Sequence, residues 1–148
     1  MIRRATPADA AAMAEVWLRS RTAALPTVRR AHSDDDVRAW FRNVVVPHRE
    51  SWVADDEGVI VGLLVLDGSW VSQLYVEPAR RGEGIGTSLL NHAKQQCPDG
   101  LELWTFQVNV LAQRFYENHG FVEVERTDGA ANEELEPDVR YVWNRAVE

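Results

Sequence analysis

The chain has 148 residues and a formal net charge of −7, and its 45% hydrophobic and 26% charged content is ordinary for one globular domain. This composition excludes a collagen-like or wholly disordered chain, and the excess of acids argues against general binding of nucleic acid. No apolar run approaches the roughly 18 residues of a membrane span, and the N-terminus becomes polar too early for a signal peptide. Cys97 is the only cysteine. We therefore expect one cytoplasmic domain over residues 1–148, without metal, nucleic-acid or membrane binding.

Two helices are predicted in the N-terminal third of the chain. A Thr-Pro pair at positions 6 and 7 is typical of a helix start, and apolar residues then recur at helical spacing through Leu18. Ser33 before three aspartates indicates a second start, because acids favour the positive end of the helix dipole. We expect Pro47 to end this helix and residues 21–32 to form a loop.

The rest of the sequence alternates between strand and helix patterns, separated by Gly, Pro and Asp turn signals. Strands are predicted at residues 51–54, 59–66, 70–76, 101–107, 121–125 and 139–143, and helices at 85–97 and 109–118. The order ααβββαβαββ predicts an α+β fold with a mixed, mostly antiparallel sheet flanked by helices. The helix at 85–97 joins the strands at 70–76 and 101–107, which could therefore be parallel neighbours.

Three alternating glycines, Gly82, Gly84 and Gly86, lie between a predicted strand and a predicted helix. Such a bend lets backbone amides approach an anion closely, and the helix N-terminus adds positive partial charge. A P-loop would need lysine at Gly86, and a dinucleotide fingerprint would need glycine at Thr87. Both interpretations fail on spacing. A phosphate or pyrophosphate is the natural ligand, and a turn without a ligand is the alternative.

Two blocks of sequence together resemble the GNAT superfamily of N-acetyltransferases. The first is Arg81-x-x-Gly84-x-Gly86 after the strand that ends at residues 74–78, which is similar to the family's acyl-CoA signature. The second spans residues 109–121 and contains Asn, a small residue three positions later, an aromatic-Tyr-Glu triplet and Gly-Phe. The order of the predicted elements also matches, so the resemblance covers nearly the whole chain.

The resemblance implies acetyl-CoA as co-substrate and a strand that splays from its neighbour before the glycine loop. The main chain of Leu74, Tyr75 and Val76 would bind the pantetheine arm, and one amide, of Leu74 or Val76, would polarise the thioester carbonyl. Asn109 would bind the same arm, although an N-cap role explains it equally well. The pyrophosphate would lie against the loop residues Arg81, Gly82, Glu83, Gly84, Ile85, Gly86 and Thr87, with the Glu83 side chain turned to solvent.

Catalytic roles are also carried over by the resemblance. Tyr116 would act as the acid that protonates the CoA thiolate, and a core aromatic is the alternative. Some family members have a general-base Glu where this chain has Trp70 and Trp104, and neither tryptophan can accept a proton. The acceptor amine is then weakly basic, or waters carry its proton away. Residues that could hold such water are Ser72, Gln73, Glu77 and the acidic loop before the last strand.

Four acids of that loop, Glu133, Glu134, Glu136 and Asp138, suggest a site that recruits a cationic amine, with a solvated acidic loop as the alternative.

We interpret the chain as an acetyl-CoA-dependent N-acetyltransferase in which an amine attacks the thioester directly. Cys97 has no histidine arrangement nearby, so a covalent acyl-cysteine is not expected. Alternatives are the same chemistry with a larger acyl-CoA, or a non-catalytic acyl-CoA sensor or partner-binding module. The acceptor, a small-molecule or peptide amine, cannot be identified from the sequence, and neither can the oligomeric state, although homodimers are frequent in such families.

Overall fold

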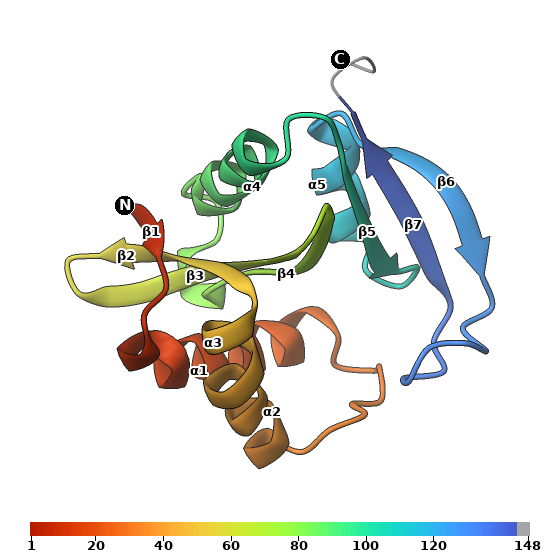
Figure 1. Ribbon diagram of the computed structural model, residues 1–148. Coiled ribbons are helices and arrows are strands. Elements are labelled where there is room, and N and C mark those ends of the chain that lie inside the picture. The colour runs from red at the N-terminus through yellow and green to blue at the C-terminus, as the bar shows by residue number, and fades with distance from the viewer. Residues whose placement is uncertain (145–148) are drawn as a thin grey trace.

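A seven-stranded sheet forms the centre of the computed structural model, which describes residues 1–144 (Figure 1). Its strands lie in the order β1-β2-β3-β4-β5-β7-β6, and every neighbouring pair is antiparallel except the parallel pair of β4 and β5. The strands are β1 (Ile2–Arg4), β2 (Glu50–Asp56), β3 (Val59–Asp67), β4 (Trp70–Val76), β5 (Leu101–Phe106), β6 (Val122–Thr127) and β7 (Asp138–Trp143). The predicted α+β class and the predicted parallel pair are both confirmed.

Helices cover both faces of this sheet, with α1 and α2 on one face and α4 on the other (Figure 1). The helices are α1 (Ala10–Ala24), α2 (Asp34–Trp40), α3 (Val46–His48), α4 (Ile85–Gln96) and α5 (Val110–Asn118). Short 3-10 turns cover Pro7–Asp9 and Pro78–Arg80, and a π-helical turn covers Phe41–Val45. Within residues 1–144, no helix is long and apolar enough to cross a membrane.

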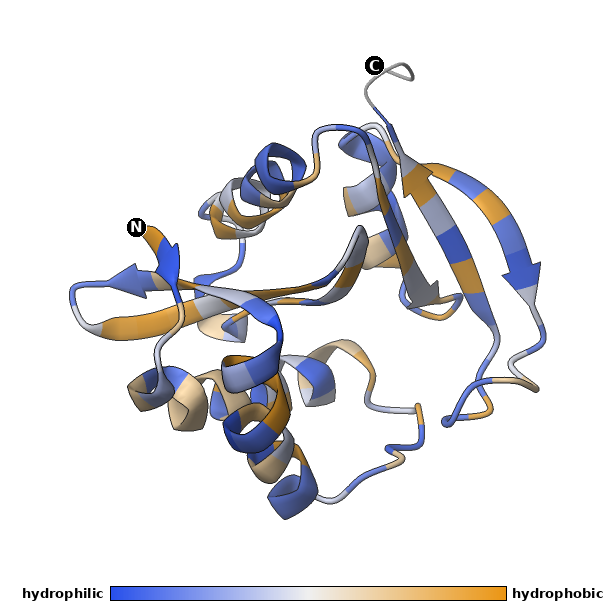
Figure 2. Cartoon of the chain, in the orientation of Figure 1, coloured by the Kyte–Doolittle hydropathy of each residue, from blue (hydrophilic) through white to orange (hydrophobic). Residues whose placement is uncertain are grey.

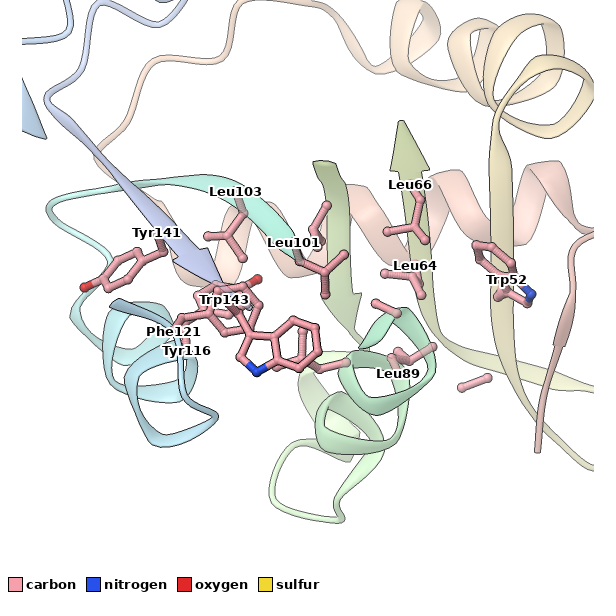
Figure 3. Packing of buried hydrophobic residues seen from close by; sticks show 14 of the residues in the cluster. Trp52, Leu64, Leu66, Leu89, Leu101, Leu103, Tyr116, Phe121, Tyr141 and Trp143 are labelled. Atoms are coloured by element: carbon pink, nitrogen blue, oxygen red, sulfur yellow. The ribbon is translucent and has the colours of Figure 1, made fainter. Parts of the chain in front are cut away.

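Figure 2 shows that the inner strand β3 is apolar along nearly its whole length. Both of its faces are buried, which explains this composition. Leu63 and Val65 pack under α1 and α2. Leu64 and Leu66 point to the opposite face, toward Leu89 of α4 (Figure 3). The core on the α4 face continues into β5, β7 and α5, where it contains the ring of Tyr116. The continuous apolar run from residue 59 is therefore a strand between two layers.

Three details differ from the sequence-based prediction. The loop predicted at residues 21–32 begins later, because α1 continues through Ala24, where two alanines favour helix. The three-residue edge strand β1 was not predicted, because its strand character comes from pairing with β2, in which Ile2 lies opposite Ala54, and not from alternation. The second helix continues one residue past Pro47, to His48. Its preceding turn is π-helical, with the Val46 N–H donating to the Phe41 carbonyl, and this wider turn accommodates the proline ring.

Candidate active site

β4 and β5 are neighbours that separate almost at once, and this separation opens the site. Trp70 opposite Glu102 is their single register pair, and Figure 1 shows the two strands diverging beyond it. Ser72 is an extra residue in β4 between the pairs that Val71 and Gln73 form with β3. Such a bulge bends a strand and increases its twist. The expected splay before the glycine loop is therefore present.

The pairing of β4 with β3 decides which backbone groups face the opening. The Glu77 N–H donates to the Val61 carbonyl over 2.8 Å, so Glu77 is turned toward β3. Because this orientation alternates along an antiparallel strand, the backbone groups of Val76 and Leu74 face away from β3, and those of Tyr75 face it. The Ser20 hydroxyl donates to the Val76 carbonyl over 2.7 Å, which leaves the Val76 N–H for a ligand. Tyr75 borders the opening with its side chain. The contact of Ser20 with Val76 was not apparent from the sequence.

The glycine loop after β4 leaves the first turn of α4 uncapped. Gly82 and Gly84 have φ values of 82° and 84°, a left-handed conformation that favours glycine, and a Cβ at either position would meet no atom within 4 Å. Gly84 is the N-cap and supplies no side-chain hydrogen bond to α4. The N–H groups of Ile85, Gly86 and Thr87 therefore lack intrahelical partners and carry the positive end of the helix dipole.

Two adjacent arginines of this loop have different partners. The Arg80 guanidinium pairs with Glu83 and with Asp56, each at 2.9 Å. Arg81 is exposed and has no ion-pair partner among the described residues. Glu83 was expected to face solvent, and its half-exposed carboxylate is instead held against Arg80. A single uncompensated cation thus lies beside the uncapped helix start.

α5 forms the other wall of the opening. Asn109 caps it, because its side-chain oxygen accepts the Ala112 N–H over 3.1 Å, and the predicted N-cap is confirmed. Gly86 lets the start of α4 lie close to α5, since a Cβ there would lie 3.4 Å from the Phe115 ring. Thr87 and His119 join the two helices through a 3.1 Å contact between the hydroxyl and the imidazole.

Tyr116 lies on the buried face of α5 and is 9% exposed. Its ring packs between Phe115 and Phe121, with centroids 5.3 and 5.5 Å away. Its hydroxyl makes no hydrogen bond within the part of the chain that the structure describes. Burial raises the pKa of Tyr116 well above its usual value, so the phenol keeps its proton at neutral pH.

These elements enclose a cleft of about 440 Å³, here called the glycine-loop cleft. It brings together every residue predicted for the cofactor except Glu83, and Tyr116 lines it as well. Its lining includes Leu74, Val76, Arg81, Gly84, Asn109 and Tyr116. This cleft can hold an extended anionic molecule on its uncapped helix amides and free strand amides. The protonated phenol can supply one proton.

Two further hollows of about 450 and 520 Å³ are also lined by Tyr75 and are here called together the Trp104 cleft. Trp104 is 41% exposed and lines both of them, as do Phe106 and Glu134. Trp70 lines neither. The Trp17 ring packs edge-on against Tyr75, with centroids 5.8 Å apart.

Two loops cover the Trp104 cleft. The loop after α1 is held by the buried Arg21 guanidinium, which donates to the carbonyls of Leu25, Val28 and Arg29. The loop between β6 and β7 is held by the Asn132 side-chain amide, which donates to the Glu136 carbonyl over 2.7 Å. The two loops meet where His32 Nε2 lies 2.8 Å from Glu133 Oε2.

The four acids of the β6–β7 loop have different surroundings. Glu133 contacts His32, and Asp138 is buried and accepts the Asn132 amide and the Thr127 hydroxyl. Glu134 lines both hollows, and its Oε2 is buried without a hydrogen-bond partner. Burial, and secondarily the charge of Glu133, raise the pKa of Glu134. The acidic cluster therefore contributes one unpaired carboxylate to the cleft.

Comparisons with known proteins, by sequence and by fold, both point to acetyltransferases. Residues 47–123, just over half of the chain, match a family model described as an acetyltransferase (GNAT) domain. The chain is 29% identical over 122 residues to the peptidyl-lysine N-acetyltransferase YiaC of Escherichia coli, and the match covers 82% of both chains.

Solved structures agree with this match. The solution structure of apo-form YjaB from Escherichia coli superposes with a TM-score of 0.80 at 25% identity, covering 97% of this chain and 96% of that one. The PaiA N-acetyltransferase of Thermoplasma acidophilum, crystallised with coenzyme A, has a TM-score of 0.69 at 20% identity and covers 97% and 98%.

Proposed function

Because the chain belongs to the GNAT family of acetyltransferases, we propose that it transfers the acetyl group of acetyl-CoA to the ε-amine of a lysine in a protein or peptide. Family and relatives make the chain an N-acetyltransferase, which argues against the non-catalytic acyl-CoA-binding module. The lysine acceptor is supported by the peptidyl-lysine activity for which the YiaC relative is named and by the residues that line the Trp104 cleft.

The observation that carries the proposal is the junction of the two clefts at Tyr75. The pyrophosphate of acetyl-CoA would lie on the unpaired amides at residues 85–87, with Arg81 neutralising part of its charge. The pantetheine arm would follow the free edge of β4 past Asn109. This path places the thioester where the glycine-loop cleft meets the Trp104 cleft.

The chemistry then follows from groups already described. The Leu74 or Val76 N–H would donate to the thioester carbonyl and stabilise the oxyanion that forms as the amine attacks. Tyr116, protonated and free of partners, would give its proton to the departing CoA thiolate. Cys97 lies at the far end of α4, its thiol donates to the Gly68 carbonyl, and burial raises its pKa. Direct transfer therefore fits better than an acyl-cysteine intermediate.

A lysine side chain fits the Trp104 cleft in shape and in charge. Trp17, Trp40 and Trp104 line the 520 Å³ hollow and can pack against an aliphatic stem or an ammonium group. Glu134 lines the same hollow and supplies negative charge there.

The proposal is tested by release of CoA thiol from acetyl-CoA against a panel of lysine peptides, polyamines and free amino acids. We expect lysine peptides to be acetylated fastest. Tyr116→Phe should lower kcat by about 100-fold or more while the Kd for acetyl-CoA stays within about twofold.

Tyr141→Phe is the matched control. Tyr141 belongs to the same aromatic cluster, but its hydroxyl donates to Glu117 and not to the glycine-loop cleft. This variant should keep its activity. Equal losses in both variants would remove Tyr116 from the mechanism, and no thiol release with any lysine peptide would overturn the acceptor assignment.

A further inference from the structure

Transfer to lysine, on which this inference rests, requires a proton to leave the acceptor first. A lysine amine has a pKa of about 10.4, so only about one in 2,500 is neutral at pH 7. A base beside the amine removes this limitation. β4 and β5 offer none, because Trp104 lines the cleft and the Glu102 carboxylate is bound to Arg140 at 2.6 Å.

Other carboxylates near the opening between β4 and β5 are paired or exposed. Asp36 lines the 520 Å³ hollow but is an exposed residue of α2. Glu77, at the end of β4, accepts three hydrogen bonds from Arg19. Asp138 is tied within its own loop by Thr127 and Asn132. Among the carboxylates that line the Trp104 cleft, Glu134 thus differs in having a buried oxygen that nothing in the described chain satisfies. A buried carboxylate oxygen is costly to leave unpaired, and an incoming ammonium would satisfy it.

The position of Glu134 also suits a group that holds the acceptor amine. Both hollows of the Trp104 cleft include Glu134 together with Tyr75, and the 450 Å³ hollow also includes Asn109, which borders the glycine-loop cleft. An ε-amine held by Glu134 would therefore lie between the aromatic walls and the thioester.

We infer that Glu134 binds the lysine ammonium and accepts its proton, directly or through one water, in place of a base on the sheet. The neutral amine then attacks the thioester carbon with its lone pair, the C–N bond forms and the C–S bond breaks. Tyr116 protonates the thiolate, and the second proton lost by the nitrogen restores the Tyr116 hydroxyl. Lysine ammonium and acetyl-CoA yield acetyl-lysine, CoA thiol and one proton, which leaves Glu134 through the cleft to solvent.

The charges around Glu134 suit this role. Burial and Glu133 raise the pKa of Glu134, whereas its own backbone N–H, Arg21 from α1 and His32 from the loop after α1 act in the opposite direction. Tyr75 from β4 faces the same group, and burial raises its pKa to about 12, so its phenol stays neutral. A carboxylate with a raised pKa is a stronger base than a solvated one.

The test compares Glu134→Gln with Glu136→Gln in the full chain. Both substitutions remove one charge from the same loop, but the Glu136 side chain lines neither hollow. With a lysine peptide at pH 7, Glu134→Gln should lower kcat/KM by about 100-fold and leave the acetyl-CoA Kd within about twofold. Glu136→Gln should stay within about twofold of wild type.

The pH profile separates proton transfer from a structural role. Wild-type kcat/KM should rise with pH as Glu134 loses its proton and then level off. In Glu134→Gln it should keep rising toward the amine pKa, so that the 100-fold loss falls below about 10-fold at pH 10. A peptide with aminoethylcysteine in place of lysine, which carries a less basic amine, should lose less activity in the variant.

The outcomes are distinguishable. A wild-type enzyme that acetylates lysine peptides, together with a Glu134→Gln variant that is equally active or equally impaired at every pH, would overturn the role of Glu134 alone. A wild-type enzyme that acetylates no lysine peptide would overturn the proposed function. Thermal melting checks the fold, and removal of a buried unpaired charge should not lower the Tm.

Discussion

The two clefts at the opening between β4 and β5 are lined by different kinds of groups. The glycine-loop cleft takes most of its wall from one stretch of chain, residues 74–87, and offers mainly backbone N–H groups. The Trp104 cleft takes its walls from α1, the loop after it, α2, β4, β5 and the β6–β7 loop, and offers mainly side chains. A constant ligand can thus be bound by one local motif, whereas acceptor choice is spread over distant segments.

The largest effect, a loss of CoA binding at the glycine-loop cleft, is expected from Gly84→Ala. Gly58, in the β2–β3 turn, is the matched control, because it also has a positive φ, of 91°, and open space around its Cβ position. Both variants should lose similar stability, about 1–2 kcal/mol. Calorimetry should show about 100-fold weaker CoA binding for Gly84→Ala alone, since its Cβ enters the path of the pyrophosphate. Equal CoA binding by the two variants would contradict a backbone cradle.

The stability of the Trp104 cleft, which α1 helps to line, is expected to depend on Asp9 at the start of α1. Two hydrogen bonds from Arg3 hold its carboxylate and lower its pKa to about 2. The stabilisation is therefore complete above pH 4 and is lost as the pH falls toward 2. Asp9→Asn should lower the free energy of unfolding by about 2 kcal/mol at pH 7 and much less at pH 2.

Urea unfolding at several pH values measures this effect. Asp35→Asn is the control, because Asp35 pairs with Arg38 on the exposed surface of α2. It should change stability by less than about 0.5 kcal/mol. A pH-independent loss in Asp9→Asn would rule out the charged contact as its cause.

A smaller effect should distinguish the two arginines of the glycine loop. Arg81→Ala should weaken CoA binding by about 10-fold at low salt and by less at high salt, because its charge is free for the phosphates. Arg80→Ala should weaken it less, since Asp56 and Glu83 already neutralise that charge. Titration calorimetry at two ionic strengths measures both, and a larger loss from Arg80→Ala would reverse the assignment.

The smallest effect is expected where His32 meets Glu133 across the two loops. The pair is exposed, so His32→Ala should raise the KM for a lysine peptide by no more than about threefold. The Kd for acetyl-CoA should not change, because the contact lies outside the glycine-loop cleft. His48→Ala, at the exposed end of α3, should change neither constant. Altered CoA binding in His32→Ala would show that the two sides are coupled.

Residues whose roles depend on local backbone conformation were predictable. Gly82, Gly84 and Asn109 lie at a left-handed bend, an N-cap and a second N-cap, and each role is apparent from neighbours within a few positions. Glu134 could be named from sequence only as one of four acids, because its selection depends on which of them reaches the cleft with a buried, unsatisfied oxygen after folding. The Ser20 bond to Val76 joins residues 56 positions apart and left no signal in the sequence.

The sequence by itself determined the order of the elements after β1, the parallel connection through α4 and the uncapped helix start, since these follow from hydrophobic period and glycine placement over short distances. Only the tertiary structure decided where β4 leaves β5, which amides face the gap and which acid stays unpaired. Strand partners and buried charges are settled by contacts between segments far apart in the chain, and no local pattern encodes such contacts.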